Sequence, residues 1–388
     1  MQHQFDRIID RHNTGSWKWD EFGSKVLPMW IADMDFSAPD CVKQSLHEAV
    51  EHGVFGYSHI TDELVEIILD RLAKRHSINA AANDLIFLPG LVTGINLACK
   101  CAGEAGDEVI VPTPAYPPFL IAPSNQKRKC IKVPMVKNAE TWELDFDALE
   151  EKVTSASKLL LLCNPHNPTG RVFTKAELLK IGEFACKHDL IICSDEIHCD
   201  LVLDKSSKHI SIASLSSEIA DRTITLLAPS KTFNIAGLGF SFAVITNPDL
   251  RNKFKPVDDG LVSHINQLGF VAAKAAYKSG ENWRTELIEY LQENLEIVKT
   301  ELAKIPDLEV TIPQATYLAW IDCSKLGLKN PSHYFLQEGI GLGFGSYFGN
   351  KQFVRINFAC PRETLLKGLD IIKLACAKLK NNFRQLLD

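Results

Sequence analysis

The fold is indicated most clearly by KLLLLCNPHNPTG (158–170), together with LIICSDEIH (190–198) and TITLLAPSK (223–231). In each stretch a mostly apolar run ends abruptly in polar residues. Continuous apolar runs are typical of strands buried on both faces of a mostly parallel sheet. The polar residues that follow them include Asn167, Asp195 and Lys231. We expect these three side chains to meet at the carboxyl edge of that sheet, where doubly wound α/β proteins bind their ligands.

Further apolar runs extend the pattern in both directions along the chain: DLIFLP (84–89), EVIVPT (108–113), CIKVPM (130–135) and FAVITN (242–247). Segments with helical periodicity, such as ELLKIGEFACKHD (177–189), separate the runs. Repeated βα units of this kind predict an α/β domain with a mostly parallel mixed sheet.

A long helix is expected to begin near Glu281, because apolar residues from Leu287 to Ile305 recur every three or four positions. Three candidate strands follow it, DLEVTIP (307–313), YLAWID (317–322) and FVRINFA (353–359). The resulting division is an N-terminal arm over 1–40 that is part of the small domain, a large domain over 41–280 and a smaller α+β domain over 281–388. The glycine-rich segment GIGLGFGSYFGN (339–350) is interpreted as a flexible loop near a site.

Composition excludes several classes of partner. The 388 residues carry a net charge of −6, and no block of Lys and Arg stands out, so neither nucleic acid nor an anionic membrane is expected to bind. The N-terminus lacks the apolar core of a secretory signal, and no run of 18 apolar residues occurs. The 11 cysteines include no C-x-x-C pair, which indicates reduced thiols and a cytoplasmic protein. Cys193 and Cys199 are interpreted as buried filler, and no metal site is expected.

The polar residues at the strand ends suit pyridoxal 5'-phosphate. A partly desolvated lysine such as Lys231 has a lowered pKa and can attack an aldehyde. A carboxylate such as Asp195 keeps a pyridine nitrogen protonated, and the amide of Asn167 can hydrogen-bond a ring oxygen. The turn LPGLVTGINLA (88–98) places Gly90 at a helix N-terminus, which suits a phosphate, and Tyr116 offers an aromatic face.

The order of the motifs PGLVTG, TPAY, NPHNPTG, SDEIH, SKTFNIAGLG and FVRIN resembles the fold-type I pyridoxal-phosphate enzymes, which have the aminotransferase-like fold. More narrowly, HGVFGYS (52–58), LLCNPHNPTG, ICSDEIH, SKTFNIAGL and ATYLAWID (315–322) are similar to those of the MalY/PatB-type cysteine–sulfur β-lyases. The resemblance covers nearly the whole chain.

The resemblance implies a role for each matching residue. Lys231 is implied as the Schiff-base lysine and proton shuttle, and Arg355 as the residue that binds the substrate carboxylate. Tyr57 is implied to reach the neighbouring subunit's site in a homodimer, where it contacts cofactor and substrate. Tyr116 is implied to stack on the ring and to face the substrate. The remaining implied cofactor contacts are Asp195 with the pyridine nitrogen, Asn167 with the ring oxygen, Ser230 and the backbone of Leu91 and Val92 with the phosphate, and His198 without a defined partner.

Structural alternatives stay open for several of these residues. Asp195 could cap a turn, Asn167 could form a turn between two prolines, and Arg355 could be a solvated arginine at a strand edge. Tyr57 could pack internally, and His198 could form core hydrogen bonds. The sequence also departs from many aminotransferases, which carry a phosphate-binding arginine where Gly239 stands here and often a hydroxyl residue where Ala228 stands.

The implied reaction is α,β-elimination from an amino acid with sulfur at Cβ, yielding a thiol, pyruvate and ammonia. Cystathionine, cystine, cysteine and larger S-conjugates are all compatible substrates. An aminotransferase is the alternative enzyme, and a regulatory protein that acts through partner binding is the alternative outside enzymes.

Overall fold

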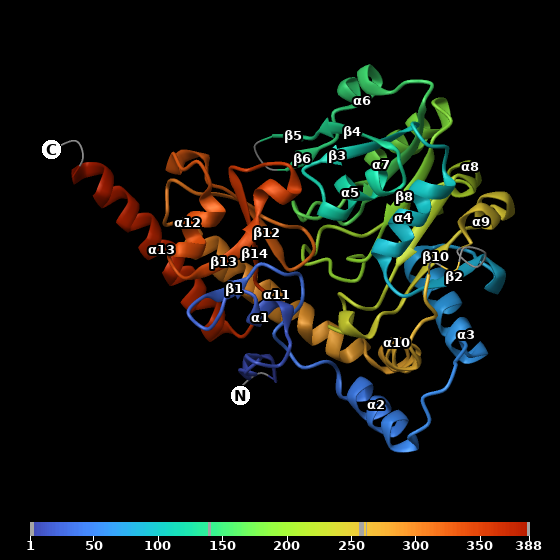
Figure 1. Cartoon of the computed structure of the whole chain (residues 1–388), viewed down its shortest axis with the longest axis horizontal. Helices are drawn as coiled ribbons and strands as arrows, with labels where there is room; N and C mark the ends of the chain where they lie inside the picture. The colour runs from blue at the N-terminus through green and yellow to red at the C-terminus, as the bar shows by residue number, and fades with distance from the viewer. Residues whose placement is uncertain (1–3, 139–140, 256–259, 261, 386–388) are drawn as a thin grey trace.

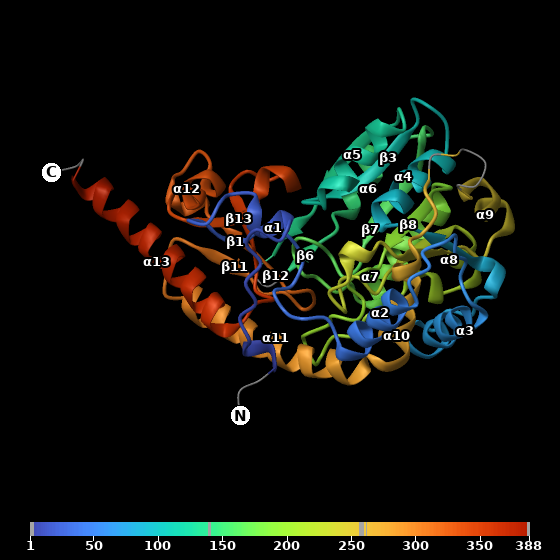
Figure 2. The ribbon, with the colours of Figure 1, turned by 60° about the horizontal axis from the view of Figure 1, so that its bottom comes forward.

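Two β-sheets organise the residues that the computed structural model describes, which are 4–138, 141–255, 260 and 262–385. Figure 1 shows the larger sheet and its helices on the right and the smaller sheet on the left. Figure 2 shows the helices α10 (Gln267–Ser279) and α11 (Glu281–Leu302) running beneath both parts. Among the described residues no helix combines the length and the apolar character needed to cross a bilayer.

The larger sheet has seven strands, and every neighbouring pair is parallel except the two pairs that β10 makes. This arrangement confirms the mostly parallel mixed sheet predicted from the apolar runs. The carboxyl ends of the other six strands therefore lie at one edge. In spatial order the strands are β2 (Leu85–Leu88), β10 (Ser241–Val244), β9 (Thr223–Leu227), β8 (Ile191–Asp195), β7 (Ser157–Cys163), β3 (Glu108–Thr113) and β4 (Lys129–Pro134).

Helices cover both faces of this sheet, and alternate residues of one strand enter different cores. Cys193 of β8 packs with the side chains of α4 and α5, whereas its neighbour Ile192 packs with those of α7. Both residues are fully buried, as a strand covered on two faces requires. The helices around this sheet are α2 (Asp40–His52), α3 (Asp62–Arg71), α4 (Leu91–Cys101), α5 (Pro117–Asn125), α6 (Phe146–Lys152), α7 (Lys175–Lys187), α8 (Ser217–Asp221) and α9 (Pro248–Phe254).

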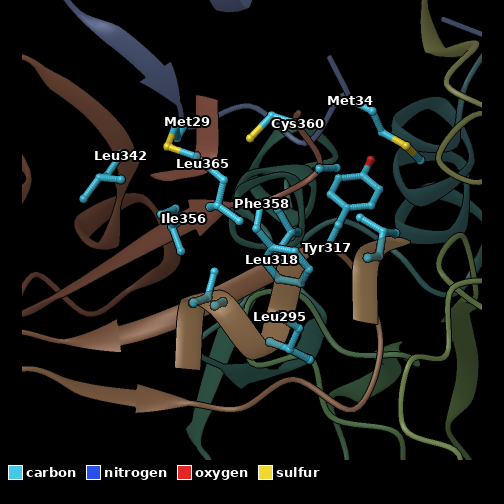
Figure 3. Packing of buried hydrophobic residues seen from close by; sticks show 14 of the residues in the cluster. Met29, Met34, Leu295, Tyr317, Leu318, Leu342, Ile356, Phe358, Cys360 and Leu365 are labelled. Carbon is cyan, nitrogen blue, oxygen red and sulfur yellow. The ribbon is translucent and has the colours of Figure 1, made fainter. Parts of the chain in front are cut away.

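The smaller sheet has five strands and includes a strand from the N-terminal segment. β1 (Leu27–Met29) pairs in parallel with β13 (Ile340–Phe344) at one side of this sheet. The order continues through β14 (Phe353–Asn357), β12 (Leu318–Asp322) and β11 (Glu309–Thr311). Figure 3 shows Met29 and Met34 of the N-terminal segment among the buried side chains of this part of the molecule. The remaining elements are α1 (Trp17–Asp20), α12 (Pro331–Gln337), α13 (Arg362–Gln385) and the two-stranded β5 (Val136–Lys137) with β6 (Trp142–Glu143).

The predicted long helix is confirmed as α11, which begins at Glu281. Its apolar stripe, including Leu287, Leu291 and Leu302, is buried in the core shared with the five-stranded sheet. The three predicted strands around it are also present as β11, β12 and β14.

The interpretation of GIGLGFGSYFGN as a flexible loop is wrong. Residues Ile340–Phe344 form the buried strand β13, and the helical turn Gly345–Phe348 follows directly. Its glycines serve close packing: a Cβ on Gly345 would lie 2.0 Å from the carbonyl oxygen of Phe353, and one on Gly343 would lie 3.2 Å from the Cβ of Arg355. Glycine at these positions permits two backbones to approach closely, so the glycine-rich composition of this segment does not indicate flexibility.

Candidate active site

The carboxyl edge of the seven-stranded sheet brings the predicted residues together. Asp195 is the last residue of β8, and it is in register with Cys163 of β7 and Leu226 of β9. Asn167 follows β7 by four residues, and Lys231 follows β9 by four residues. These residues therefore leave three adjacent strands at the same edge of the sheet.

The amine of Lys231 points at the N-terminal segment. Its Nζ donates a hydrogen bond to the carbonyl oxygen of Ala32 at 2.6 Å. Burial, together with the nearby charge of Arg355, lowers the pKa of Lys231 to about 8, although Asp33 and Asp195 oppose the shift. A larger share of neutral, nucleophilic amine is therefore present near neutral pH than an exposed lysine would offer.

Asp195 is buried, and within the described part of the chain no side chain hydrogen-bonds its carboxylate. Its Oδ1 accepts the backbone N–H of Ile197 at 3.1 Å, so the side chain does serve the turn considered above. Burial nevertheless raises the pKa of Asp195 to about 7, against the opposing effects of that hydrogen bond and of Lys231. A buried acid with so little compensation is suited to a cationic partner such as a protonated ring nitrogen.

Arg355 and Asn167 form a buried pair. Nη1 of Arg355 donates to Oδ1 of Asn167 at 2.8 Å, and Nη2 donates to the carbonyl oxygen of Trp30 at 2.7 Å. The guanidinium also lies over the ring of Phe348, 4.6 Å from its centroid. Arg355 is 5% exposed on β14, which lies inside the sheet, so it is not a solvated arginine at a strand edge. Because Oδ1 of Asn167 is taken by Arg355, its amide NH2 group is the part oriented for donation elsewhere.

At this edge of the sheet, Nε of Arg355 and Nδ1 of His198 are buried and have no partner among the described residues. Burial, with the charges of Lys231 and Arg355, lowers the pKa of His198 to about 3, so its ring stays neutral. The unpartnered Nδ1 argues against the reading of His198 as a satisfied core histidine. Unpaired polar atoms of this kind are expected where a ligand supplies the missing partners.

Tyr116 lies beyond the end of β3, directly before α5. Burial raises the pKa of its phenol, and the charge of Asp195 adds to the shift while Arg355 opposes it. Tyr116 is half-buried, and the effects of Asp195 and Arg355 on its pKa place its phenol near both charged groups.

The N-terminus of α4 lies at the same edge, because β2 ends at Leu88 and α4 begins at Leu91. A Cβ added to Gly90 would meet no atom within 4 Å, so the helix start has open space in front of it. The first backbone N–H groups of a helix have no intrahelical acceptor, and they attract anions. Ser230, which precedes Lys231, is half-buried.

The structure gives a physical reason for the glycine at position 239. Its φ is +62°, a left-handed conformation, and a Cβ there would lie 3.1 Å from the carbonyl oxygen of Pro89. An arginine at this position would therefore be strained whatever it might bind.

Tyr57 lies apart from the other predicted residues. It belongs to the connection between α2 and α3 and is fully exposed, as are most of the neighbouring Val54 and Phe55 side chains. Internal packing is therefore excluded as its role in this chain. Figure 1 shows this connection at the lower right, at the periphery of the molecule.

Sequence reasoning missed the contribution of the N-terminal segment to the site. The carbonyl oxygen of Ala32 accepts from Lys231 and also from the phenol of Tyr317 at 3.0 Å. Asn357, two residues after Arg355 on β14, donates to the carbonyl oxygens of Ile31 and Asp33, each at 2.6 Å. Backbone carbonyls carry no residue-type signature, so no motif in the sequence marks these carbonyl oxygens as part of the site.

Chemically, the site joins a half-buried amine of lowered pKa, a buried acid of raised pKa, an amide oriented by a guanidinium, and an open helix N-terminus. These groups fit pyridoxal phosphate: the amine suits its aldehyde, the acid its ring nitrogen, the amide its ring oxygen and the helix start its phosphate.

Comparisons with known proteins identify similar chains. A family model described as aminotransferase class I and II matches residues 24–372. Cystathionine beta-lyase PatB of Bacillus subtilis is 36% identical over 384 residues, covering 96% of this chain and 99% of that protein. The crystal structure of OvoB superposes with a TM-score of 0.94 at 43% identity, covering 96% of this chain and 99% of that one. Cystalysin from Treponema denticola, whose structure contains pyridoxal 5'-phosphate, gives a TM-score of 0.93 at 34% identity over 98% of this chain and 100% of that one.

Proposed function

The chain belongs to the aminotransferase class I and II family, and we propose that it is a pyridoxal-phosphate-dependent carbon–sulfur β-lyase. It cleaves the Cβ–S bond of a sulfur-containing amino acid and releases a thiol, pyruvate and ammonia. The observation that carries the proposal is the convergence of Lys231, Asp195 and the Asn167–Arg355 pair at one sheet edge. The similarity to chains named as cystathionine beta-lyases supports the choice of bond.

The residues around the sheet edge would hold the cofactor. Asp195 would pair with the ring nitrogen, and Asn167 would donate its NH2 group to the ring oxygen. Tyr116 would cover one face of the ring. Ser230 and the backbone N–H groups of Leu91 and Val92 would bind the phosphate, and His198 would contribute its unpartnered nitrogen. When bound, pyridoxal phosphate supplies an aldehyde for the substrate amine and a ring that accepts electron density from Cα.

The same edge would bind the substrate and move its proton. Arg355 would bind the α-carboxylate through the guanidinium donors that its contacts with Asn167 and Trp30 leave available. That contact would fix the orientation of Cα relative to Lys231. The neutral amine of Lys231 would then remove the Cα proton, and its pKa of about 8 suits a base that works near neutral pH.

A homodimer would complete each site. Val54 and Phe55 are each 62% exposed and Tyr57 is fully exposed, so the connection between α2 and α3 presents apolar surface to solvent. Burial of these side chains against a second copy would stabilise the dimer and bring Tyr57 to the neighbouring cofactor phosphate and substrate. We also propose a cytoplasmic location, because the cysteines are free thiols.

The decisive experiment is incubation of the purified protein with cystathionine and no keto acid. We expect equal amounts of pyruvate and homocysteine, because elimination needs no amino acceptor. Activity that appears only when a keto acid is added would support an aminotransferase instead.

Replacement of the lysine tests the assignment of the base. We expect Lys231→Ala to lose the cofactor's Schiff-base absorbance and to lower turnover by at least ~10²–10⁴-fold. The exposed, ion-paired Lys274 offers a matched control, and Lys274→Ala should keep both. If Lys231→Ala kept either the Schiff-base absorbance or the turnover, the assignment of Lys231 would be wrong.

Hybrid dimers test whether Tyr57 acts across the interface. Lys231→Ala and Tyr57→Ala proteins should each have low activity alone. If Tyr57 serves the neighbouring site, a mixture exchanged in equal amounts should recover about a quarter of wild-type activity, because half of the dimers carry one complete site. If Tyr57 serves its own site, the mixture should recover none.

A further inference from the structure

A second cluster of metal-binding side chain types lies on another part of the larger domain. His76 ends the helical turn Leu72–His76 that continues α3, Cys199 lies in the turn after β8, and His209 lies in the connection that follows. All three are buried. One ligand atom from each residue lies within 4.8 Å of the other two.

The imidazoles of this cluster have nitrogen atoms without partners. Nδ1 of His76 and Nδ1 of His209 are buried and make no hydrogen bond to any described residue. His76 is 6% exposed and His209 is 7% exposed, so solvent does not replace the missing partner readily. An unsatisfied buried nitrogen costs stability unless something binds it.

A buried carboxylate orients one of these rings. Nε2 of His209 lies 2.9 Å from Oε2 of Glu196, whose other oxygen accepts the hydroxyls of Ser194 and Ser211, each at 2.9 Å. A carboxylate here favours the tautomer that carries its proton on Nε2, which leaves the lone pair on Nδ1. Histidines that bind metals are commonly oriented in this way through their second nitrogen.

We propose that His76, Cys199 and His209 bind one zinc-like divalent cation through two imidazole nitrogens and one thiolate. This ligand set combines borderline and soft donors, which favour Zn²⁺ over Mg²⁺ or Ca²⁺. Tetrahedral zinc separates its nitrogen ligands by roughly 3.4 Å, so the side chains would close by about 1.4 Å at most around the ion. Side-chain rotations are sufficient for a movement of this size.

A surface groove of about 340 Å³ reaches the three ligands and provides a route for the ion and for a water molecule at the fourth position. The groove is also lined by four cationic side chains, those of Lys74, Arg75, Lys208 and Arg284. Arg75 and Arg284 are paired with Glu281, Arg75 is also paired with Asp200, and Lys74 is paired with Asp70. These acidic partners offset part of the repulsion of an incoming cation.

Bound metal would join three segments that are distant in sequence. It would tie the turn that follows α3 to the end of β8, where Cys199 lies four residues after Asp195, and to the segment that carries His209. The ion would therefore hold the strand end that positions Asp195, without contacting the cofactor. This role is separate from the proposed lyase chemistry.

Zinc binding by the holoenzyme tests the proposal. The protein is equilibrated with zinc sulfate, desalted and analysed for zinc by mass spectrometry. We expect about one equivalent per chain in the wild type and less than a tenth of that in His76→Leu and Cys199→Ser. Cys323→Ser, which alters a buried thiol outside the cluster, should bind as the wild type does. Zinc should also raise the wild-type Tm by about 2 °C or more and leave the Tm of His76→Leu unchanged.

Cobalt gives a second readout that needs no variant. Co²⁺ added to the wild type should produce a thiolate charge-transfer band in the near ultraviolet, and Zn²⁺ should abolish it. Failure of the wild type to retain zinc, or equal zinc in the wild type and both cluster variants, would overturn the proposal. Absence of the cobalt band would overturn it even if the variants failed to fold.

Discussion

Arg355→Lys tests the substrate-binding role most directly, because it keeps the positive charge and removes the planar fork of donors. In the structure Nη1 and Nη2 are engaged by Asn167 and Trp30, while the buried Nε has no partner among the described residues. A lysine ammonium cannot hold both partners and also bind a carboxylate bidentately. One lost charge-assisted hydrogen bond costs about 1.5–3 kcal/mol, which corresponds to a loss of about 10- to 150-fold in kcat/KM.

The assay couples pyruvate release to its reduction and follows the reaction over a range of cystathionine concentrations. We expect most of the loss in KM, because the carboxylate is bound before and during proton transfer. Arg128→Lys is the matched control: Arg128 is also buried, donates to the carbonyl oxygen of Cys99 at 2.8 Å and lies outside the site. A kcat/KM for Arg355→Lys within threefold of the wild type, or an equal loss in Arg128→Lys, would refute the reasoning.

Three further predictions concern packing, pH and the cofactor motif. Gly345→Ala should lower the free energy of unfolding by at least ~1–3 kcal/mol, because its Cβ would lie 2.0 Å from the carbonyl oxygen of Phe353. Gly237→Ala is the control: its Cβ would meet nothing within 4 Å, so its free energy of unfolding should stay within about 0.5 kcal/mol of the wild type. Equal denaturation midpoints for the two variants would contradict this prediction. The rate at which apoenzyme recombines with pyridoxal phosphate should rise about tenfold per pH unit and level off above pH about 8, because only the neutral amine of Lys231 attacks the aldehyde; a rate still rising at pH 10 would disprove the lowered pKa. Gly239→Arg should cost about 1–3 kcal/mol of stability because of its φ of +62°, and an unchanged Tm would show that the strain is relieved.

The parts of the site that sequence could predict are those with a distinctive side chain at a strand end. Apolar runs locate the strands, and parallel strands bring their carboxyl ends to one edge, so Asn167, Asp195 and Lys231 could be placed together without coordinates. Roles for Arg355 and Tyr57 came only from family resemblance, because neither follows a strand of the larger sheet. The structure adds burial and contacts for the first and full exposure for the second.

Other parts depend on contacts that no residue type announces. The carbonyl of Ala32 accepts from Lys231, yet every residue has a carbonyl. Gly343 and Gly345 allow close approach of backbones, although glycine-rich composition suggests flexibility. The proposed metal ligands follow no familiar spacing, so the sequence alone favours the interpretation of Cys199 as buried filler. Only the three-dimensional arrangement places it beside two unpartnered histidine nitrogens.

The bond between Arg355 and the carbonyl oxygen of Trp30 spans 325 positions of the chain. During synthesis on the ribosome, Trp30 emerges among the first residues, and its carbonyl oxygen has no Arg355 to accept from until nearly the entire polypeptide has been made. The seven-stranded sheet can form in the meantime, since all its strands precede Arg355. A nascent chain would therefore contain Lys231 and Asp195 before it contained Arg355, the residue proposed to orient the substrate. The ability to select an amino acid would form only as translation ends.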